Sequence, residues 1–368
     1  MAPKTLPSSG LRVPQDDLHA WTLAVVRRLG TPEDIARDVA DALLAADARG
    51  VSTHGTFKLP VYALVAENGV LDVEARPTRE SGTDVLAVWD AHDGWGQHSG
   101  RVMMDDAIDR AQELGMAGAI ARRASHFGIA GWYAMRAASR GTIGMVMTNT
   151  APLVAPTRGR DKILGTNPIA LAAPADNGRM FVLDMATSAI TWGHVLTSSR
   201  HGTPLPEGTA IDPDGGPTTD PDRVLHGGAL LAVGGREETG GHKGYGLALM
   251  IDILTGVLSG AAFGAHVVPQ SRRATEPSDL GQSFLAIDPR ALGDDGFQSR
   301  LASYLDELRA SATAPDAAGP VLVHGDPEAA NHAAQVDGIR MSSPDHESLV
   351  ALGERLGIPF PPAVPFST

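Results

Sequence analysis

The spacing of apolar residues along the sequence changes near residue 84, and this change constrains the fold more than any other feature of the sequence. Residues 85–89 are apolar, residues 97–114 form an amphipathic stretch of helix length, and residues 117–121 are apolar again. Alternation of this kind is typical of α/β folds. Further apolar runs bounded by Gly, Pro or Asn predict buried strands at 143–147, 169–173, 181–183 and 284–287.

Both ends of the chain differ from this central part. The first thirteen residues are polar and rich in Pro and Ser, which predicts a flexible arm and no signal peptide. Near the other end we expect a charged helix, a strand at 321–323 and a last helix beginning near Ser343, all folding back onto N-terminal helices. The predicted division is an arm of 1–13, a mainly helical lobe of 14–80 plus about 297–368, and an α/β lobe of 81–296.

Residues 244–268 could be mistaken for a membrane span, because Asp252 is their single acidic residue and they are nearly long enough to cross a bilayer. Their many Gly and Ala residues, and flanks without a Lys/Arg cluster, favour a buried helix instead. We predict a core helix here and no membrane association.

Composition excludes several classes of function. The 368 residues include no cysteine, which rules out disulfides, thiolate metal sites and cysteine nucleophiles and agrees with a cytoplasmic protein. The formal net charge of −13 argues against a nucleic-acid or anionic-membrane partner. Gly-x-Gly-x-x-Gly, Walker A and Gly-x-Ser-x-Gly motifs are also absent from the sequence.

Two histidines at predicted turns are candidates for chemistry. His126, in Ser-His-Phe-Gly, follows a predicted strand and precedes a helix at 131–139, where a near-neutral imidazole suits proton transfer. The alternative is a histidine that only caps or braces a loop. His54, in Thr-His-Gly, precedes Lys58 by four residues, which places an imidazole and a cation on one side of a helical turn as a carboxylate clamp. The alternative there is a helix-entry loop with a solvated lysine.

Small and polar residues at other strand ends could hold a ribose or a phosphate, although each segment is also ordinary turn chemistry. Residues 240–246 are the most distinctive, since glycines surround His242 and Lys243 ahead of a long helix. We predict no metal site, because His54, His126, His194 and His242 lack metal-ligand spacing and a carboxylate motif. The remaining segments of this kind are 165–168 and 184–188.

Taken in order, these segments resemble the malate/L-lactate dehydrogenase family that lacks a Rossmann fold. That family includes ureidoglycolate and sulfolactate dehydrogenases, 2,3-diketogulonate reductase and Δ1-piperideine-2-carboxylate reductase. The similarity runs from about Asp16 to Pro361. It rests on residues 49–51, 53–55, 94–97, 125–128, 148–150, 164–168, 184–188, 242–246 and 325–328.

The resemblance implies an α/β fold with a mixed sheet, in which the helical lobe serves substrate binding and dimerisation and the α/β lobe binds NAD or NADP. It also implies a homodimer with the cofactor groove between subunits. The implied reaction moves a hydride to or from the carbon next to the carboxylate of a small substrate, either a 2-oxo/2-hydroxy acid or a cyclic ketimine. A metal-dependent hydrolase and a non-catalytic nucleotide-binding relative are the alternatives of other classes.

The resemblance also assigns roles to residues. His126 corresponds to the catalytic acid/base, and His54 to a catalytic histidine beside the substrate and nicotinamide. Substrate contacts are Thr53, His54 and Lys58. The implied cofactor contacts are Phe127, Gly128, Thr150, Thr166, Asn167, Asp184, Met185, Ala186, Thr187, Ser188, His242, Lys243, Gly244, Gly325, Asp326, Pro327 and Glu328.

Three positions depart from the family pattern. Thr53 replaces a serine, Lys58 replaces an arginine, and His194 replaces a lysine after the 184–188 segment. Because arginine holds a carboxylate through two parallel hydrogen bonds and lysine offers a point charge, the change at Lys58 leaves the substrate open.

Overall fold

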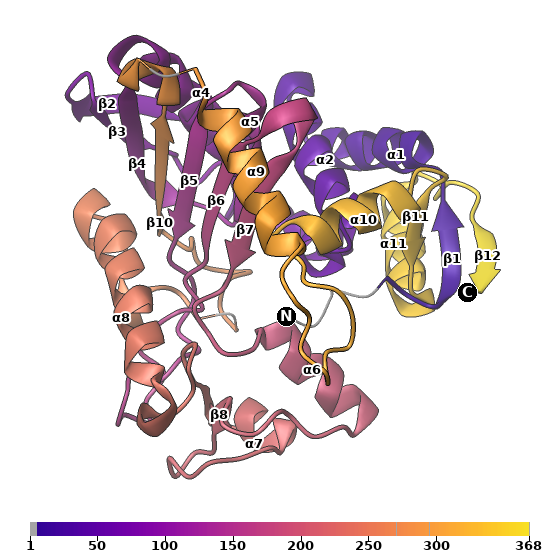
Figure 1. The fold of residues 1–368 in the computed structure, drawn as a ribbon. Helices are drawn as coiled ribbons and strands as arrows, with labels where there is room; N and C mark the ends of the chain where they lie inside the picture. The colour runs from indigo at the N-terminus through magenta and orange to yellow at the C-terminus, as the bar shows by residue number, and fades with distance from the viewer. Residues whose placement is uncertain (1–5, 270, 294, 368) are drawn as a thin grey trace.

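The computed structural model describes residues 6–269, 271–293 and 295–367, and a mixed seven-stranded sheet lies at its centre (Figure 1). The strand order is β2-β3-β4-β10-β5-β6-β7, with β3 and β4 parallel and the other neighbours antiparallel. The strands are β2 (Thr78–Gly82), β3 (Leu86–Asp90), β4 (Met116–Ala124), β5 (Ile143–Thr148), β6 (Ile169–Pro174), β7 (Met180–Met185) and β10 (Leu280–Ile287). The predicted α/β class and mixed sheet are confirmed, and so are the strand-length runs predicted between 85 and 287.

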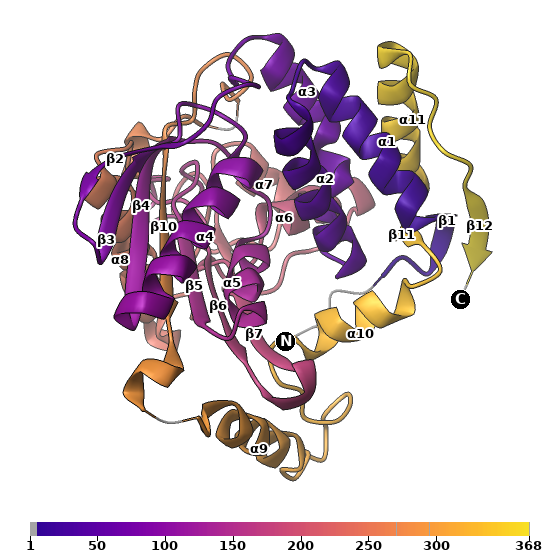
Figure 2. The same cartoon turned by 90° about the horizontal axis from the view of Figure 1, so that it is seen from above.

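Helices α4 (Gly96–Leu114) and α5 (Ala130–Ser139) cover the face of the sheet that is turned toward the N-terminal helices (Figure 2). Small residues let them approach closely, since a Cβ at Gly144 of β5 would lie 2.6 Å from the Cβ of Ala137. Tyr133 of α5 is fully buried in the same core and stacks on Phe127. This packing fixes the residues between β4 and α5.

The helical lobe has its own core, formed by α1 (Gln15–Arg28), α2 (Glu33–Ala48), α3 (Leu59–Glu67) and α11 (Ser343–Leu356). A three-stranded sheet beside it has the order β11 (Ile339–Met341), β1 (Ser9–Val13), β12 (Val364–Ser367). The prediction of a flexible arm is therefore wrong for Ser9–Val13, because the strands that order them lie at the far end of the chain. Residues 1–5 of the predicted arm lie outside the described residues.

After residue 297 the chain first crosses the sheet domain. Helix α9 (Phe297–Arg309) packs Ala302 and Leu305 against Phe181. The chain comes back to the helical lobe at α10 (Asp326–Ala334), where Asn331 donates to the Arg49 carbonyl. The strand predicted at 321–323 is wrong, because the run packs through Val323 and the chain meets the edge strand β7 only just after it, where the Val182 N–H donates to the His324 carbonyl. The other short elements are α6 (Trp192–His201), β8 (Ala210–Ile211), α7 (Pro221–Leu225), β9 (Ala229–Leu230) and the 3-10 turns Asp176–Gly178, Glu237–Thr239, Gly264–His266 and Pro289–Leu292.

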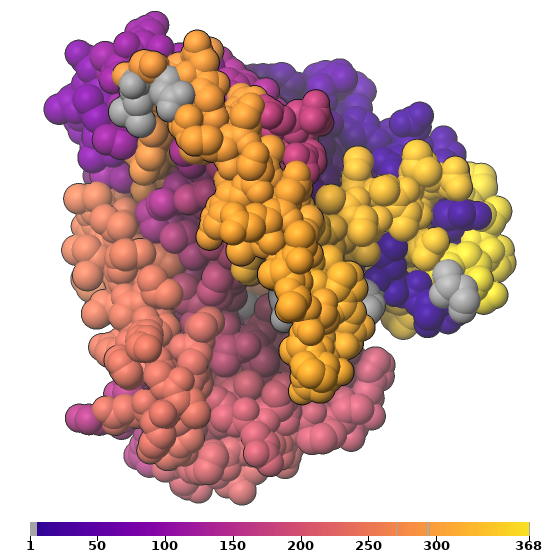
Figure 3. Space-filling view, in the orientation of Figure 1, coloured from indigo at the N-terminus to yellow at the C-terminus, as the bar shows by residue number. Residues whose placement is uncertain are grey.

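Helix α8 (Gly241–Asp252) runs on through a π-helical turn at Ile253–Val257 and stands at one edge of the molecular surface (Figure 3). It is not the core helix that was predicted. One side is buried, but the other exposes Leu247, Leu249, Met250, Ile253, Val257 and Leu258. Apolar composition cannot tell which side chains the rest of the chain covers. Among the described residues, no helix combines the length and apolar character that a membrane span needs.

Candidate active site

The turn that carries His54 and Lys58 is folded around a buried carboxylate. After α2 ends, two 3-10 turns follow, Ser52–His54 and Thr56–Lys58. The side chain of Asp47 accepts hydrogen bonds from the Thr56 backbone N–H (2.9 Å) and hydroxyl (2.7 Å). Gly55 is required between the turns, because a Cβ there would lie 1.8 Å from Asp47 Oδ1. The turn therefore presents its side chains in a fixed direction.

His126 follows β4 and meets this turn. The Ser125 carbonyl before it accepts from Gln282 Nε2 at 2.9 Å, and Gly128 after it adopts a φ of 81°, which glycine favours. The rings of His54 and His126 stack with centroids 5.4 Å apart, and Thr53 Oγ1 lies 3.0 Å from His54 Nδ1. The structure thus brings the two histidines singled out in the sequence into contact.

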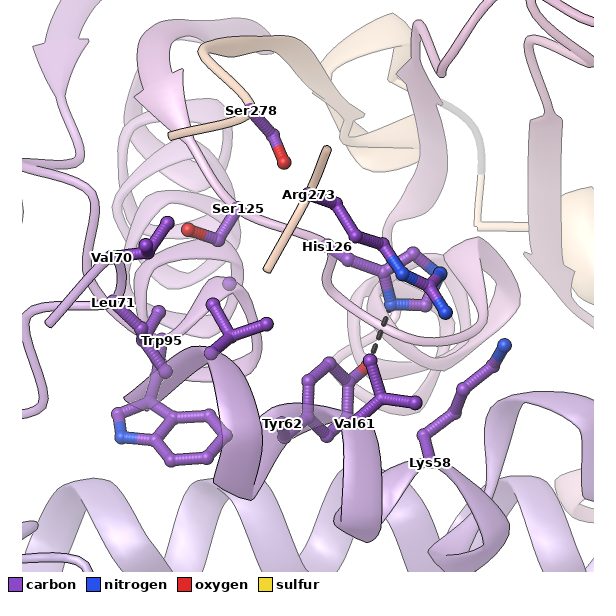
Figure 4. Close-up of a pocket in the computed structure, with 12 residues that line it drawn as sticks. Lys58, Val61, Tyr62, Val70, Leu71, Trp95, Ser125, His126, Arg273 and Ser278 are labelled. Atoms are coloured by element: carbon purple, nitrogen blue, oxygen red, sulfur yellow. Dashed lines mark hydrogen bonds between the residues drawn. The ribbon is translucent and has the colours of Figure 1, made fainter. Parts of the chain in front are cut away.

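Tyr62 of α3 contacts His126 from the other side, with its hydroxyl 2.6 Å from Nδ1 (Figure 4). The Gly128 N–H lies 3.4 Å from the same nitrogen. Burial lowers the pKa of His126 well below its usual range, and His54, Lys58 and Arg273 lower it further. The imidazole is therefore neutral at neutral pH, and Nε2 is the nitrogen left for a ligand.

A cavity of about 600 Å³, counted out to its open mouth, lies beside His126. Lys58 and Arg273 lie on the same side as the imidazole, and Val70, Leu71 and Trp95 face them across the cavity (Figure 4). Burial, and then Arg273, lower the pKa of Lys58 to about 8, and burial also lowers that of Arg273. Neither Asp nor Glu occurs among the described residues that line it, so this end of the cavity favours an anion.

A second pocket of about 390 Å³ lies next to the turn that carries His54 and the loop that carries His126. Arg49 and Val51, just before that turn, line it together with Ile129 and Gly131, just after that loop. It brings together three predicted cofactor residues, Asp184, Gly325 and Glu328. The Gly131 N–H donates to Asp184 Oδ2 at 2.9 Å. Burial lowers the pKa of Arg49, and the carboxylates of Glu328 and Asp184 act in the opposite direction.

Other predicted cofactor residues form one network at the ends of β5 and β7. Thr150 Oγ1 accepts from the Thr166 N–H at 2.9 Å, and Thr187 Oγ1 donates to the Asn167 carbonyl at 3.1 Å. Asn167 in turn donates to Ala248 of α8. Ser188 is buried and donates to the Ile190 carbonyl, while Met185 and Ala186 beside it are half-buried.

The start of α8 closes this group, because Gly244 packs against the backbone of Val233, whose N–H donates to Thr187. His242 and Lys243 in its first turn are exposed. Exposed N–H groups and a lysine at a helix start are donors suited to a diphosphate, and carboxylates such as Asp184 accept from ribose hydroxyls. By donor chemistry, the residues present fit a nicotinamide dinucleotide.

Three predicted cofactor residues make other contacts within the protein. The Phe127 side chain packs in the core, and its carbonyl accepts from the Tyr133 hydroxyl at 2.6 Å. Asp326 forms an ion pair with Arg309 (2.8 Å), and Pro327 opens α10 beside it. Of the residues that depart from the family pattern, His194 is exposed in the first turn of α6, whose Gly193 lies close to Thr53.

Sequence reasoning missed Tyr62, Arg273 and Arg49. Tyr62 lies in an apolar helix and is typical of a core residue, and Arg273 belongs to an irregular segment with no periodicity. Arg49 stood in a matched segment but received no role. In the part of the chain that the structure describes, no group of three or more His, Asp or Glu side chains could hold a metal ion.

Comparisons with known proteins identify the family of this chain. The family model described as malate/L-lactate dehydrogenase matches residues 13–350. The malate dehydrogenase of Pyrococcus abyssi is 40% identical over 318 residues, which is 86% of each chain, and the L-sulfolactate dehydrogenase of Methanocaldococcus jannaschii is 36% identical over 91% of this chain and 94% of its own.

Solved structures give the same result. The malate dehydrogenase of Pyrococcus horikoshii superposes with a TM-score of 0.88 at 36% identity, covering 96% of this chain and 98% of its own. The Δ1-piperideine-2-carboxylate reductase of Pseudomonas syringae pvar. tomato gives 0.83 at 29% identity, with 93% and 99% covered. The chain belongs to the malate/L-lactate dehydrogenase family and is an NAD(P)-dependent oxidoreductase.

Proposed function

We propose that the chain transfers a hydride between a nicotinamide cofactor and the carbon next to the carboxylate of a small acid, so that 2-hydroxy and 2-oxo acids are interconverted. The observation that carries this proposal is the position of His126 beside Lys58 and Arg273 at one end of an otherwise largely apolar cavity. The two cations can hold a carboxylate while the imidazole exchanges a proton with the oxygen on the neighbouring carbon.

The residues divide the chemistry as follows. Oxidation removes a hydride from C2 of the 2-hydroxy acid and a proton from its hydroxyl. A bound nicotinamide would supply the acceptor for the hydride. Neutral His126 takes the proton at Nε2. In reduction the imidazolium returns this proton to the carbonyl oxygen. A bound carboxylate opposes the positive field of Lys58 and Arg273, which makes protonation of His126 easier when substrate is present.

For the cofactor, we infer that NAD or NADP binds along the network of Thr150, Thr166 and Thr187 and the start of α8. His242 and Lys243 would hold its diphosphate, and the second pocket with Asp184 and Glu328 would hold a hydroxyl-bearing part. This arrangement would bring the cofactor toward His54 and His126, since the two segments that carry them line both pockets.

Reduction of a cyclic ketimine carboxylate is the second candidate. The wall formed by Val61, Val65, Val70 and Leu71 would hold the methylenes of a small ring, while Lys58 and Arg273 hold its carboxylate. His126 would then donate its proton to the imine nitrogen instead of a carbonyl oxygen.

The exposed side of α8 supports a homodimer. Met250, Ile253 and Val257 follow helical spacing, and Leu247 and Leu258 extend the same exposed apolar surface at either end. We propose that a second copy of the chain covers this surface, next to the inferred cofactor groove. Dependence on a nicotinamide cofactor and the lack of cysteine support a cytoplasmic location.

The experiment that tests this function follows NADH and NADPH oxidation against a panel of 2-oxo acids and cyclic imine carboxylates. We expect turnover with one substrate class, insensitive to chelators, and we expect His126→Ala to lower it by about a hundredfold or more because the acid/base is lost. Binding of the reduced cofactor, followed by its fluorescence, should persist in this variant. Unchanged turnover in His126→Ala would refute the assignment, and activity abolished by a chelator would favour a metal-dependent hydrolase.

A further inference from the structure

The cavity beside His126 leaves one direction for the side chain of a substrate. C2 of a 2-oxo acid carries three groups in one plane, which are the carboxylate, the carbonyl oxygen and the side chain. The proposed function assigns the first to Lys58 and Arg273 and the second to His126, and these three residues gather at one end of the cavity (Figure 4). The third group therefore points toward the rest of the lining.

Most of that lining comes from one stretch of chain. Val61 and Val65 are four residues apart on α3, which places them on one face of the helix, and both line the cavity. The Val65 carbonyl accepts from the N–H groups of Val70 (3.1 Å) and Leu71 (3.4 Å), and this turn brings their side chains to the same cavity. These four side chains form an apolar surface, which we call the aliphatic wall.

Trp95 extends the aliphatic wall without adding a polar contact. Its indole N–H donates to Thr31 Oγ1 at 3.0 Å, so the polar atom of this side chain is already bonded within the protein. Ser125 and Ser278 add hydroxyl groups to the lining but no charge. Among the described residues that line the cavity, the charged side chains therefore lie only at the end that holds the carboxylate.

The two cations at that end serve one carboxylate. The Lys58 ammonium and the Arg273 guanidinium point to the same part of the cavity (Figure 4). Arg273 also contributes to the lowered pKa of Lys58, as expected of two positive charges at short range. A dicarboxylate with one group on each cation would place both of its ends beside His126 and leave the aliphatic wall without a contact.

This distribution of charge discriminates between substrates. A second carboxylate on the substrate side chain would lose its water against the aliphatic wall and would meet no cation there, which is strongly unfavourable. Methyl and methylene groups in the same position are favoured, since each buried CH2 group strengthens binding by about fourfold.

We propose that the preferred substrate is a monocarboxylate whose side chain is apolar, larger than a methyl group, and held by the aliphatic wall. This inference rests on the proposed function, which places the carboxylate and the reacting carbon. Two kinds of substrate share this chemistry. One is a branched aliphatic 2-oxo acid, and the other is a cyclic ketimine carboxylate whose ring methylenes form the side chain.

Binding of unreactive acids tests the cavity without any turnover. Calorimetry on the full-length chain at pH 7, saturated with the nicotinamide cofactor that it binds, compares 4-methylpentanoate, cyclohexanecarboxylate and butanedioate. We expect one of the two apolar acids to bind about tenfold or more tightly than butanedioate. The open-chain acid and the ring acid distinguish the two kinds of substrate. Equal or tighter binding of butanedioate would overturn the proposal.

Variants of the aliphatic wall give a matched comparison. Val70→Lys places a cation in the wall and should strengthen butanedioate binding by about tenfold while weakening that of 4-methylpentanoate. Val65→Ala should weaken 4-methylpentanoate binding by about fourfold or more and leave butanedioate unchanged. Leu64→Ala, at the next position of α3, removes a side chain that is 46% exposed and outside the lining, and should change neither affinity. A folded Val65→Ala with wild-type affinities would overturn the role of the wall.

Turnover separates this inference from the proposed function. In the wild type, kcat/KM for 4-methyl-2-oxopentanoate or for a cyclic ketimine carboxylate should exceed that for oxaloacetate by about tenfold or more. A preference for oxaloacetate overturns the inference while supporting the proposed hydride transfer. Turnover of no 2-oxo acid or ketimine overturns the proposed function, and the affinities for the unreactive acids still decide whether the cavity selects an apolar side chain.

Discussion

At the scale of single residues, the site depends on what burial does to charge. His126 and Lys58 both have pKa values below their usual ranges, with burial as the leading cause in each. A bound anion would raise both pKa values part of the way back. His126 and Lys58 therefore bind protons more tightly when a carboxylate is in the cavity than when it is not. Substrate binding and proton uptake are therefore coupled in this site.

The lowered pKa of Lys58 predicts how KM for a carboxylate substrate changes with pH. Its pKa of about 8 in the free enzyme means that it loses its charge as the pH rises through that value. We expect the KM for a carboxylate substrate to rise above pH 8 in the wild type. Lys58→Arg should keep KM nearly flat to about pH 10, because a guanidinium stays charged. Initial rates at saturating cofactor between pH 7 and 10 measure this.

Lys58→Ala is the reference for this series. Having no charge at any pH, it should show a high KM throughout, with kcat much less affected. A wild-type KM that stays constant from pH 7 to 10 would remove Lys58 from the substrate site and leave Arg273 as the anchor.

The sequence predicted part of this arrangement and missed part of it. His54, Lys58 and His126 could be singled out because each stands at a predicted turn and because the resemblance to the family assigns a role to each. Tyr62 could not, because it lies in an apolar helix and is typical of a core residue. Only the packing of α3 against the loop after β4 shows that this side chain reaches His126.

At the scale of elements, the turn 52–58 is the most constrained part of the site. Burial raises the pKa of Asp47 to about 7, although two hydrogen bonds from Thr56 oppose this. The carboxyl group holds the turn, and among the described residues no cation lowers its pKa. Its ionisation therefore affects the stability of the fold.

The resulting prediction concerns stability against pH. Between about pH 4 and 7 the folded protein keeps a proton on Asp47 that the unfolded chain has released, so the stability contributed by this group falls as the pH rises through that window. The difference reaches a few kcal/mol, at about 1.4 kcal/mol per unit of pKa. Relative to Asp47→Asn, which cannot ionise, the wild type should lose stability between pH 4.5 and 8.

Urea unfolding of both proteins at the two pH values measures this difference. A gap between wild type and Asp47→Asn that is the same at pH 4.5 and pH 8 would contradict the raised pKa.

Strands were predicted well where the local sequence pattern determines the secondary structure. They were predicted poorly where residues far away in the sequence determine it. The strands β3 to β7 are apolar runs between turn residues, and the sequence located them. The apolar run 321–323 has the same local character but forms no strand, because the chain meets the edge strand β7 only just after it, at His324. Ser9–Val13 show the reverse, since a polar segment becomes a strand because two others lie beside it.

At the scale of the whole molecule, the exposed apolar side of α8 is the feature that most clearly indicates a second subunit. Six large apolar side chains from Leu247 to Leu258 are each 38% exposed or more. A continuous surface of this kind is typical of a subunit interface. We expect light scattering after gel filtration to give the mass of two chains, against 38.3 kDa for one.

Ile253→Asp tests the proposed interface, because a carboxylate buried between two copies is strongly unfavourable. We expect this variant to be a folded monomer with weakened cofactor binding. Val336→Asp places the same charge on an apolar side chain that is 76% exposed in a different region and should remain a dimer. A monomeric wild type at micromolar concentration, or a dimeric Ile253→Asp, would refute the assignment of the interface.

The position of β1 has a consequence for how the protein is made. This strand is the first described element to leave the ribosome, yet it pairs with β11 on one side and β12 on the other, which are synthesised last. Through nearly the whole of translation both of its edges are unpaired, and an unpaired edge can bind another nascent chain. The helical lobe is completed only once β12 has been made, so a chain cut before Val364 would leave one edge of β1 open in a protein whose proposed catalytic residues are already in place.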